Sequence, residues 1–222
     1  MSYMWNEFNI KTFPAETIVF RDGVYCEELS TLPNGPIDKK YDLPVHIIYV
    51  GEIAGKCRLD IDVSSENQKV VLSANIKNKT PAFLNVFIKN TGKDSEINGV
   101  VLMDNSSDLE YECSAHHMCK NTTVLIKNKL LAEKNSKSKL TGTAVIDKGC
   151  IDCKSDISFA AISDQGAKIE FMPAQRISAE PIAADHSASI YRATDAQITY
   201  LRSAGLSGAE VDTVIKEAFL NE

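Results

Sequence analysis

Cysteine and histidine residues in the middle of the chain have the spacing of metal ligands. Cys113 and His116 form a C-x2-H pair, and Cys150 and Cys153 form a C-x2-C pair. Two pairs of this kind can place four ligands around one tetrahedral zinc ion. On an extended strand, residues at i and i+3 point to opposite faces unless a turn intervenes, and Gly149 could supply such a turn. The spacing therefore leaves two alternatives, a zinc site and small buried thiols.

A further candidate ligand is His186, one of only four histidines in the chain. It lies in segment 183–191, where a series of short predicted strands gives way to two predicted helices. A buried partner or a metal site is easily built at such a junction. We therefore predict that His186 can act as a ligand.

The strands that would position these residues are indicated by short apolar segments. Between residues 56 and 182 such segments recur between Asn, Asp, Gly, Ser and Lys turns, and no helix of useful length fits. Evenly spaced strands of four to six residues indicate a sandwich, a barrel or a stacked solenoid, and periodicity alone does not choose among them. Nearer the N-terminus, Asp22-Gly23 between two apolar runs predicts a β-hairpin.

The C-terminal residues change to a helical pattern. Residues 194–197 and 207–210 both have the form Ser/Thr-x-x-Glu/Gln of a helix capping box. A first helix should end near Ala204, with Gly205 in the left-handed conformation, and a second should run over residues 208–220. The second helix carries one apolar stripe, formed by Val211, Val214, Ile215, Ala218 and Phe219. We expect this hairpin to pack on another surface.

Length and charge limit the possible classes of protein. The chain has 222 residues, of which 44% are hydrophobic, and a formal net charge of −6. One main domain, residues 1–190, with a helical appendage, residues 191–222, fits this length best. The negative charge disfavours binding of nucleic acid, which requires clustered Lys and Arg. The most basic stretch, residues 127–139, is interpreted as a solvated turn.

The sequence lacks the signals of secretion, of membrane insertion and of two common kinds of catalysis. Residues 1–7 have neither the basic nor the apolar region of a signal peptide, and no apolar run approaches the roughly 18 residues that span a membrane. We therefore predict a cytoplasmic protein with reduced thiols and no membrane contact. The sequence also has no Walker-type phosphate-binding motif and no nucleophile elbow, so we predict no enzymatic activity of its own.

Five short motifs follow one another in a characteristic order. They are AHHMCKNTT at 115–123, GTAVIDKG at 142–149, AAISD at 160–164, DHSASI at 185–190 and YLRSAGL at 200–206. Together with residues 18–25 they resemble the core domain of the SufB/SufD family over nearly the whole chain. Members of that family assemble iron–sulfur clusters together with the ABC-type ATPase SufC.

The resemblance implies a fold, partners and a cofactor. The fold would be a right-handed parallel β-helix closed by a C-terminal helical hairpin, which in the family contacts SufC. The chain would pair with a SufB-like subunit or with a second copy of itself. A transient iron–sulfur cluster would form at that interface, and His186 matches the SufD histidine implicated there.

Other residues are weaker candidates. Cys113, Cys119, Cys150 and Cys153 are possible cluster ligands by their chemistry alone. His116 and His117 fall on the His-rich strand of the family, where one of the two must point inward.

Some residues differ from the family pattern, and these differences indicate whether the chain is closer to SufB or to SufD. Residues 157–159 stand where SufB-type proteins have a cluster-related cysteine, and Ser187 replaces the SufB-type glutamate. The chain is therefore similar to SufD. It resembles a minimal member, because the usual N-terminal helical region is not found and the rungs between Lys56 and Leu109 are short.

The sequence thus predicts a non-enzymatic scaffold subunit of iron–sulfur cluster assembly. One alternative is a zinc-stabilised interaction module that uses Cys113, His116, Cys150 and Cys153. The other is a protein with the same fold that has lost cluster chemistry.

Overall fold

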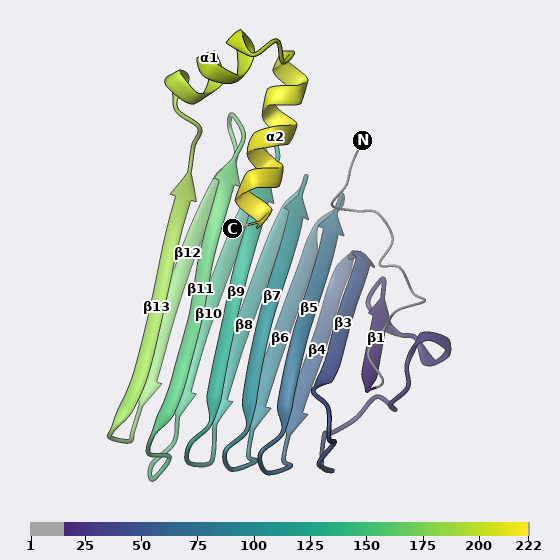
Figure 1. Ribbon diagram of the computed structural model, residues 1–222, viewed down its shortest axis with the longest axis vertical. Coiled ribbons are helices and arrows are strands. Elements are labelled where there is room, and N and C mark those ends of the chain that lie inside the picture. The colour runs from purple at the N-terminus through teal and green to yellow at the C-terminus, as the bar shows by residue number, and fades with distance from the viewer. Residues whose placement is uncertain (1–15, 222) are drawn as a thin grey trace.

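The computed structural model describes residues 16–221 and shows two sheets that face each other (Figure 1). All strand pairs in them are parallel except β1 and β2, which are antiparallel. Sheet A has the strand order β13-β11-β9-β7-β5-β3-β1-β2, and sheet B has the order β12-β10-β8-β6-β4. From β3 onward the chain alternates between the sheets, so two consecutive strands form one rung of a coil. The predicted parallel β-helix with a C-terminal helical hairpin is confirmed.

The elements have the following bounds. Sheet A contains β1 Thr17–Arg21, β2 Val24–Tyr25, β3 Val45–Glu52, β5 Lys69–Asn78, β7 Glu96–Asn105, β9 Thr123–Ala132, β11 Cys153–Ser163 and β13 Ile182–Tyr191. Sheet B contains β4 Gly55–Val63, β6 Ala82–Asn90, β8 Asp108–His117, β10 Lys137–Ile146 and β12 Lys168–Ile177. The helices are η2 Glu27–Leu29, α1 Asp195–Ser203 and α2 Gly208–Asn221.

Alternation of side chains along each strand separates an inner row from an outer row. In β5, for example, Val70, Leu72, Ala74 and Ile76 are buried, and the residues between them are partly exposed. The inner rows of the two sheets meet in one apolar core. Complete burial of one large apolar side chain stabilises the fold by about 1.5–3 kcal/mol, so the inner rows hold the rungs together.

The strands from β4 onward have 9–11 residues, which is longer than the predicted four to six. The predicted apolar segments all lie inside strands, but the polar residues beside them continue the strands at outward positions. The β-hairpin at Asp22-Gly23 is confirmed, because β1 and β2 pair there and both turn residues have positive φ. The prediction for residues 1–7 lies outside the described residues.

One corner of the coil repeats the same backbone conformation in four successive rungs. A residue with φ near +55° to +58° turns the chain there, and it is always Asn or Asp, which tolerate the left-handed region better than most residues. The next residue points inward and is fully buried. The four pairs are Asn67-Gln68, Asp94-Ser95, Asn121-Thr122 and Asp152-Cys153.

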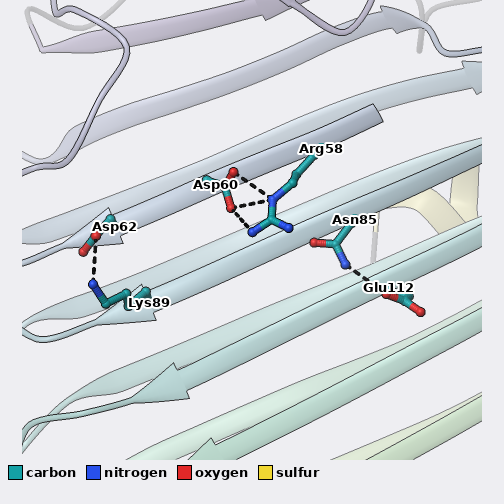
Figure 2. Close-up of polar contacts among 6 residues, drawn as sticks. All are labelled: Arg58, Asp60, Asp62, Asn85, Lys89 and Glu112. Atoms are coloured by element: carbon teal, nitrogen blue, oxygen red, sulfur yellow. Dashed lines mark hydrogen bonds and ion pairs between the residues drawn. The ribbon is translucent and has the colours of Figure 1, made fainter. Parts of the chain in front are cut away.

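Polar side chains on the outer face of sheet B connect neighbouring rungs (Figure 2). The Lys89 ammonium lies 3.2 Å from the Asp62 carboxylate, and the Asn85 amide donates to Glu112 at 2.9 Å. Surface pairs of this kind contribute about 0–1 kcal/mol each. We therefore interpret this face as a solvated covering of the coil.

Both C-terminal helices begin with the predicted caps. The hydroxyl of Thr194 accepts from the backbone N–H of Gln197, and that of Ser207 accepts from Glu210, each at 3.3 Å. Gly205 has the predicted left-handed conformation, with φ +94°. Within residues 16–221, neither these nor any other helix is long and apolar enough to cross a membrane.

The interpretation of residues 127–139 as a solvated turn was right only for residues 133–136, which form the turn between β9 and β10. The rest of the stretch belongs to these two strands, and Lys129 on β9 is only 9% exposed. Its ammonium donates to the carbonyl oxygens of Phe219 at 2.8 Å and Leu220 at 3.3 Å, and lies 5.5 Å from the centre of the Phe219 ring. A lysine of sheet A therefore caps the last turn of α2, where a cation is favoured.

Candidate functional site at the terminal rung

The last rung of the coil is open on one side. Strand β13 pairs with β11 and strand β12 pairs with β10, and within residues 16–221 neither strand has a partner on its other edge (Figure 1). Their backbone N–H and C=O groups are therefore available along two parallel edges. Such edges are templates for pairing with another chain.

The register places His186 in the inner row of this rung. Opposite it on β11 is Ile157, which is buried, and its neighbours in the same row are Ala184 and Ala188. No further rung covers this row among the described residues, so the His186 side chain is exposed. An imidazole thus stands at the open end of an otherwise apolar core.

Apolar side chains of the same inner row are left uncovered at this end of the coil. On β12, Ile177 is 40% exposed, and on β13, Ile190 is 49% exposed. Phe171 is partly covered, because its ring stacks on Phe159 of the preceding rung at 5.7 Å between centroids. The end of the coil is consequently an apolar surface with one imidazole and two free strand edges.

Two carboxylates lie next to each other on the outer side of the same strands. Asp156 on β11 and Asp185 on β13 are direct neighbours in the register. Partial burial, together with the charge of Asp185, raises the pKa of the Asp156 carboxyl, and nearby Lys127, Lys154 and His186 oppose this shift. The outer side of β11 and β13 therefore carries two adjacent carboxylates, with two lysines nearby.

The helical hairpin continues directly from β13. Helix α2 is anchored on sheet A, where Phe219 and Leu220 pack against Leu131 and Ile162. Helix α1 has no buried residue, and Tyr200 on it is 73% exposed. Between the two helices and the end of β13 is a cleft of about 270 Å³, lined mainly by apolar side chains.

A comparison of the chain with known protein families gives a match over most of its length. The family described as "SUF system FeS cluster assembly, SufBD core domain" matches residues 55–219, which is well over half of the chain. The chain belongs to the SufBD family. A search of curated proteins gives no match. SufBD proteins take part in iron–sulfur cluster assembly by the SUF system, in general as non-catalytic components.

In this SufBD core, the four residues of the predicted zinc site are not brought together. Cys113 points inward from β8 and is completely buried, which raises its pKa to about 12, whereas His116 points outward and contacts Asp147 at 3.1 Å. Cys150 and Cys153 pack together at the corner before β11. Within residues 16–221, no three His, Cys, Asp or Glu side chains form a group that could hold a metal ion.

The structure also places a histidine that the sequence could not assign. As predicted for one of the pair, His117 points inward, and it is completely buried. Its Nδ1 atom lies 2.7 Å from the hydroxyl of Thr122, which is 3.2 Å from the thiol of Cys153. Burial, with a smaller effect of His116, lowers the pKa of His117 to about 4. The sequence signal for this cluster of His117, Thr122 and Cys153 was the Asn or Asp that directly precedes the inward-pointing residue at each corner.

Proposed function

We propose that this chain is a non-enzymatic subunit of a SUF-type assembly complex, in which the terminal rung and the hairpin bind different partners. The terminal rung would pair with a SufB-like subunit or with a second copy of the chain. The hairpin would bind the ATPase SufC. The observation that carries this proposal is the exposed His186 in the inner row of an open terminal rung.

Pairing at the terminal rung would remove two unfavourable features at once. It would satisfy the free backbone groups of β12 and β13, and it would cover Ile177 and Ile190 of the inner row. Burial of apolar surface contributes about 25 cal/mol per Å², so covering this surface favours association. In such a complex, His186 would lie at the subunit interface.

An imidazole at that interface suits a cluster that must be released. Iron–sulfur clusters are usually held by thiolates, and replacement of a thiolate by histidine is a known variation. Neutral imidazole is a weaker ligand for iron than thiolate. A weaker ligand suits a cluster that the scaffold must pass on to another protein. We base the proposal on His186, because Cys113, Cys150 and Cys153 are all buried at 4% exposure or less.

The hairpin has the properties of a second docking surface. Helix α2 is fixed to sheet A, so the hairpin has a defined base, while the whole of α1 remains accessible. Tyr200, Val214 and Tyr191 leave apolar surface exposed around the cleft. A partner that inserts an apolar side chain there would bury all three.

Replacing Tyr200 by Glu is expected to abolish co-purification with a co-expressed SufC-type ATPase. The Tyr200 ring is 73% exposed, so the thermal unfolding midpoint should stay unchanged. Val24→Glu is the matched control, because Val24 is 68% exposed at the opposite end of sheet A. Retention of the ATPase by the Tyr200 variant, or its loss from both variants, would contradict docking through the hairpin.

A further inference from the structure

The inner row of strand β13 has the same residue types in both directions. It consists of Ile182, Ala184, His186, Ala188 and Ile190. Two antiparallel copies of such a row set like residues opposite each other around a two-fold axis. We propose that β13 pairs with β13 of a second copy of this chain, antiparallel and centred on His186, while Pro173 keeps the two β12 strands apart. The inference rests on the proposed function, because it specifies how the open terminal rung binds a second copy.

The free backbone groups of β13 belong to this same row. In a parallel sheet, the N–H and C=O groups of successive residues point alternately to the two sides of the strand. The carbonyl oxygen of Pro181 accepts from the backbone N–H of Asp152, directly before β11, at 2.7 Å, so the odd-numbered residues of β13 face β11. The even-numbered residues, which form the inner row, therefore present both groups to the open edge. In the proposed register, each of them joins a pair that exchanges two hydrogen bonds.

The outer row of β13 favours the same register. With the centre at His186, Asp185 lies opposite Ser187 of the second copy. A centre at Asp185 would set the two Asp185 carboxylates directly opposite each other, which is unfavourable. A centre at Ser187 would set Ile182 opposite Arg192. Charge and apolar contacts therefore both select the centre at His186.

Strand β12 presents a different edge. The backbone N–H of Lys168 donates to the carbonyl oxygen of Ser136, directly before β10, at 2.9 Å, so the even-numbered residues of β12 face β10. Pro173 is odd-numbered, and its backbone nitrogen therefore lies at the open edge, where it has no hydrogen to donate. Proline is tolerated at an edge of this kind, but a further strand cannot bond to it there.

Pro173 lies across the core from His186. A Cβ atom at Gly142 of β10 would approach the side chains of Ile157 and Phe159 of β11 to 3.0 Å or less, so these positions face each other. One rung further along, Pro173 is the register neighbour of Gly142, and His186 is that of Ile157. A two-fold axis that runs across both sheets at His186 therefore also passes near Pro173. The β12 strands stay unpaired there, and the opening between them leads to the two imidazoles.

The size of the end face fits a dimer. Strands β12 and β13 have 10 residues each. The face is about 33 Å long, and two packed sheets with their side chains are about 20 Å across. Two such faces would bury up to roughly 1,300 Å² in total, which is in the range of specific interfaces. At the opposite end, Leu32, Ile37 and Tyr41 pack on the core, and Ile37 pairs with Val63 of β4. Association through one end gives a closed dimer instead of a filament.

The mass of the full-length protein, purified alone and measured by light scattering after size-exclusion chromatography, tests the pairing. We expect twice the 24.4 kDa of one chain. Ala188→Pro removes an N–H from the open edge and leaves the bonds to β11 in place, so this variant should be monomeric with an unchanged circular dichroism spectrum. Ala188→Ser keeps the N–H and should remain dimeric. A monomeric wild type, or a dimeric Ala188→Pro variant, would overturn the proposal.

Disulfide cross-linking of the His186→Cys variant tests the register. In the proposed dimer the two copies of position 186 are directly opposite, with Cα atoms about 5.5 Å apart, a separation that a disulfide can span. Mild oxidation should give a covalent dimer linked through position 186, identified by proteolysis and mass spectrometry. Ala184→Cys is the control, because the two copies of position 184 would be about 14 Å apart. A link between two copies of position 184, or none at position 186, would contradict the register.

A SufB-like subunit would bind the same edge in place of the second copy, so its binding separates the two proposals. If the wild type is monomeric and binds a SufB-like subunit that the Ala188→Pro variant loses, pairing with a second copy is wrong and the proposed function stands. If the Ala188→Pro variant still dimerises and still binds that subunit, the open edge of β13 serves neither partner, and both proposals fail.

Discussion

Replacing His117 by Asn is expected to make the protein less sensitive to acid. In the folded protein the pKa of His117 is lowered from 6.5 to about 4, because the ring is buried. The histidine binds a proton more strongly in the unfolded chain than in the folded protein. The free energy of unfolding therefore falls as the pH decreases from about 6.5 to about 4. Each unit of pKa difference corresponds to about 1.4 kcal/mol, so this titration should lower the free energy of unfolding by about 3 kcal/mol.

Asparagine is the appropriate substitute because the preceding rung already uses it. Asn90 is the register neighbour of His117 on β6, and it bonds to Ser95 as His117 bonds to Thr122. The free energy of unfolding should be measured by urea denaturation at pH 7 and pH 4.5 for the wild type and the variant. The difference between the two proteins isolates His117 from the carboxylates. An equal loss of stability in both proteins would show that His117 does not titrate as described.

Replacing Lys129 by Met is expected to release helix α2 from sheet A. Methionine keeps much of the apolar stem but removes the cation that binds the carbonyl oxygens of Phe219 and Leu220. Hydrogen bonds to a charged group contribute about 1.5–3 kcal/mol each, and part of this is regained when the helix end reaches water. We therefore expect the free energy of opening α2 to fall by about 2 kcal/mol, which lowers the protection of its amides from hydrogen exchange about thirtyfold.

Hydrogen–deuterium exchange of the α2 amides measures this effect directly. The Lys127→Met variant is the control, because Lys127 lies two residues earlier on the same face of β9 but is exposed. Exchange in the inner strands β5 and β7 should remain slow in both variants. Unchanged protection of α2 in the Lys129 variant would mean that apolar packing alone holds the helix.

Much of the fold could be predicted because local signals agree with the final arrangement. The Asp22-Gly23 turn, the capping boxes at Thr194 and Ser207, and the apolar strand segments all act over a few residues. Strand lengths were underestimated because outward positions carry polar residues that resemble turns. The repeated Asn/Asp corner was missed, although it fixes where each rung begins and places Cys153 where the two preceding rungs have Ser95 and Thr122.

The site depends on register and on distant contacts, which the sequence does not express. The position of His186 in the inner row follows from the pairing of β13 with β11, and a shift of one residue would turn it to the outer face. Lys129 meets α2 across 90 residues of sequence, so its burial could not be anticipated from its basic neighbours. The spacing of Cys113 and His116 suggested a shared ligand set, yet strand alternation sends them to opposite faces.

The most direct test of the central claim is cluster formation by the anaerobically reconstituted complex with the His186→Ala variant. The chain would be combined with a SufC-type ATPase and a SufB-like subunit, and iron and acid-labile sulfide would be measured per complex. Ser187→Ala is the control, since Ser187 is the adjacent residue on β13 and faces the outer side. We predict a lower cluster yield for the His186 variant with the ATPase still bound. An equal yield in both variants would contradict a ligand role for this imidazole at the subunit interface.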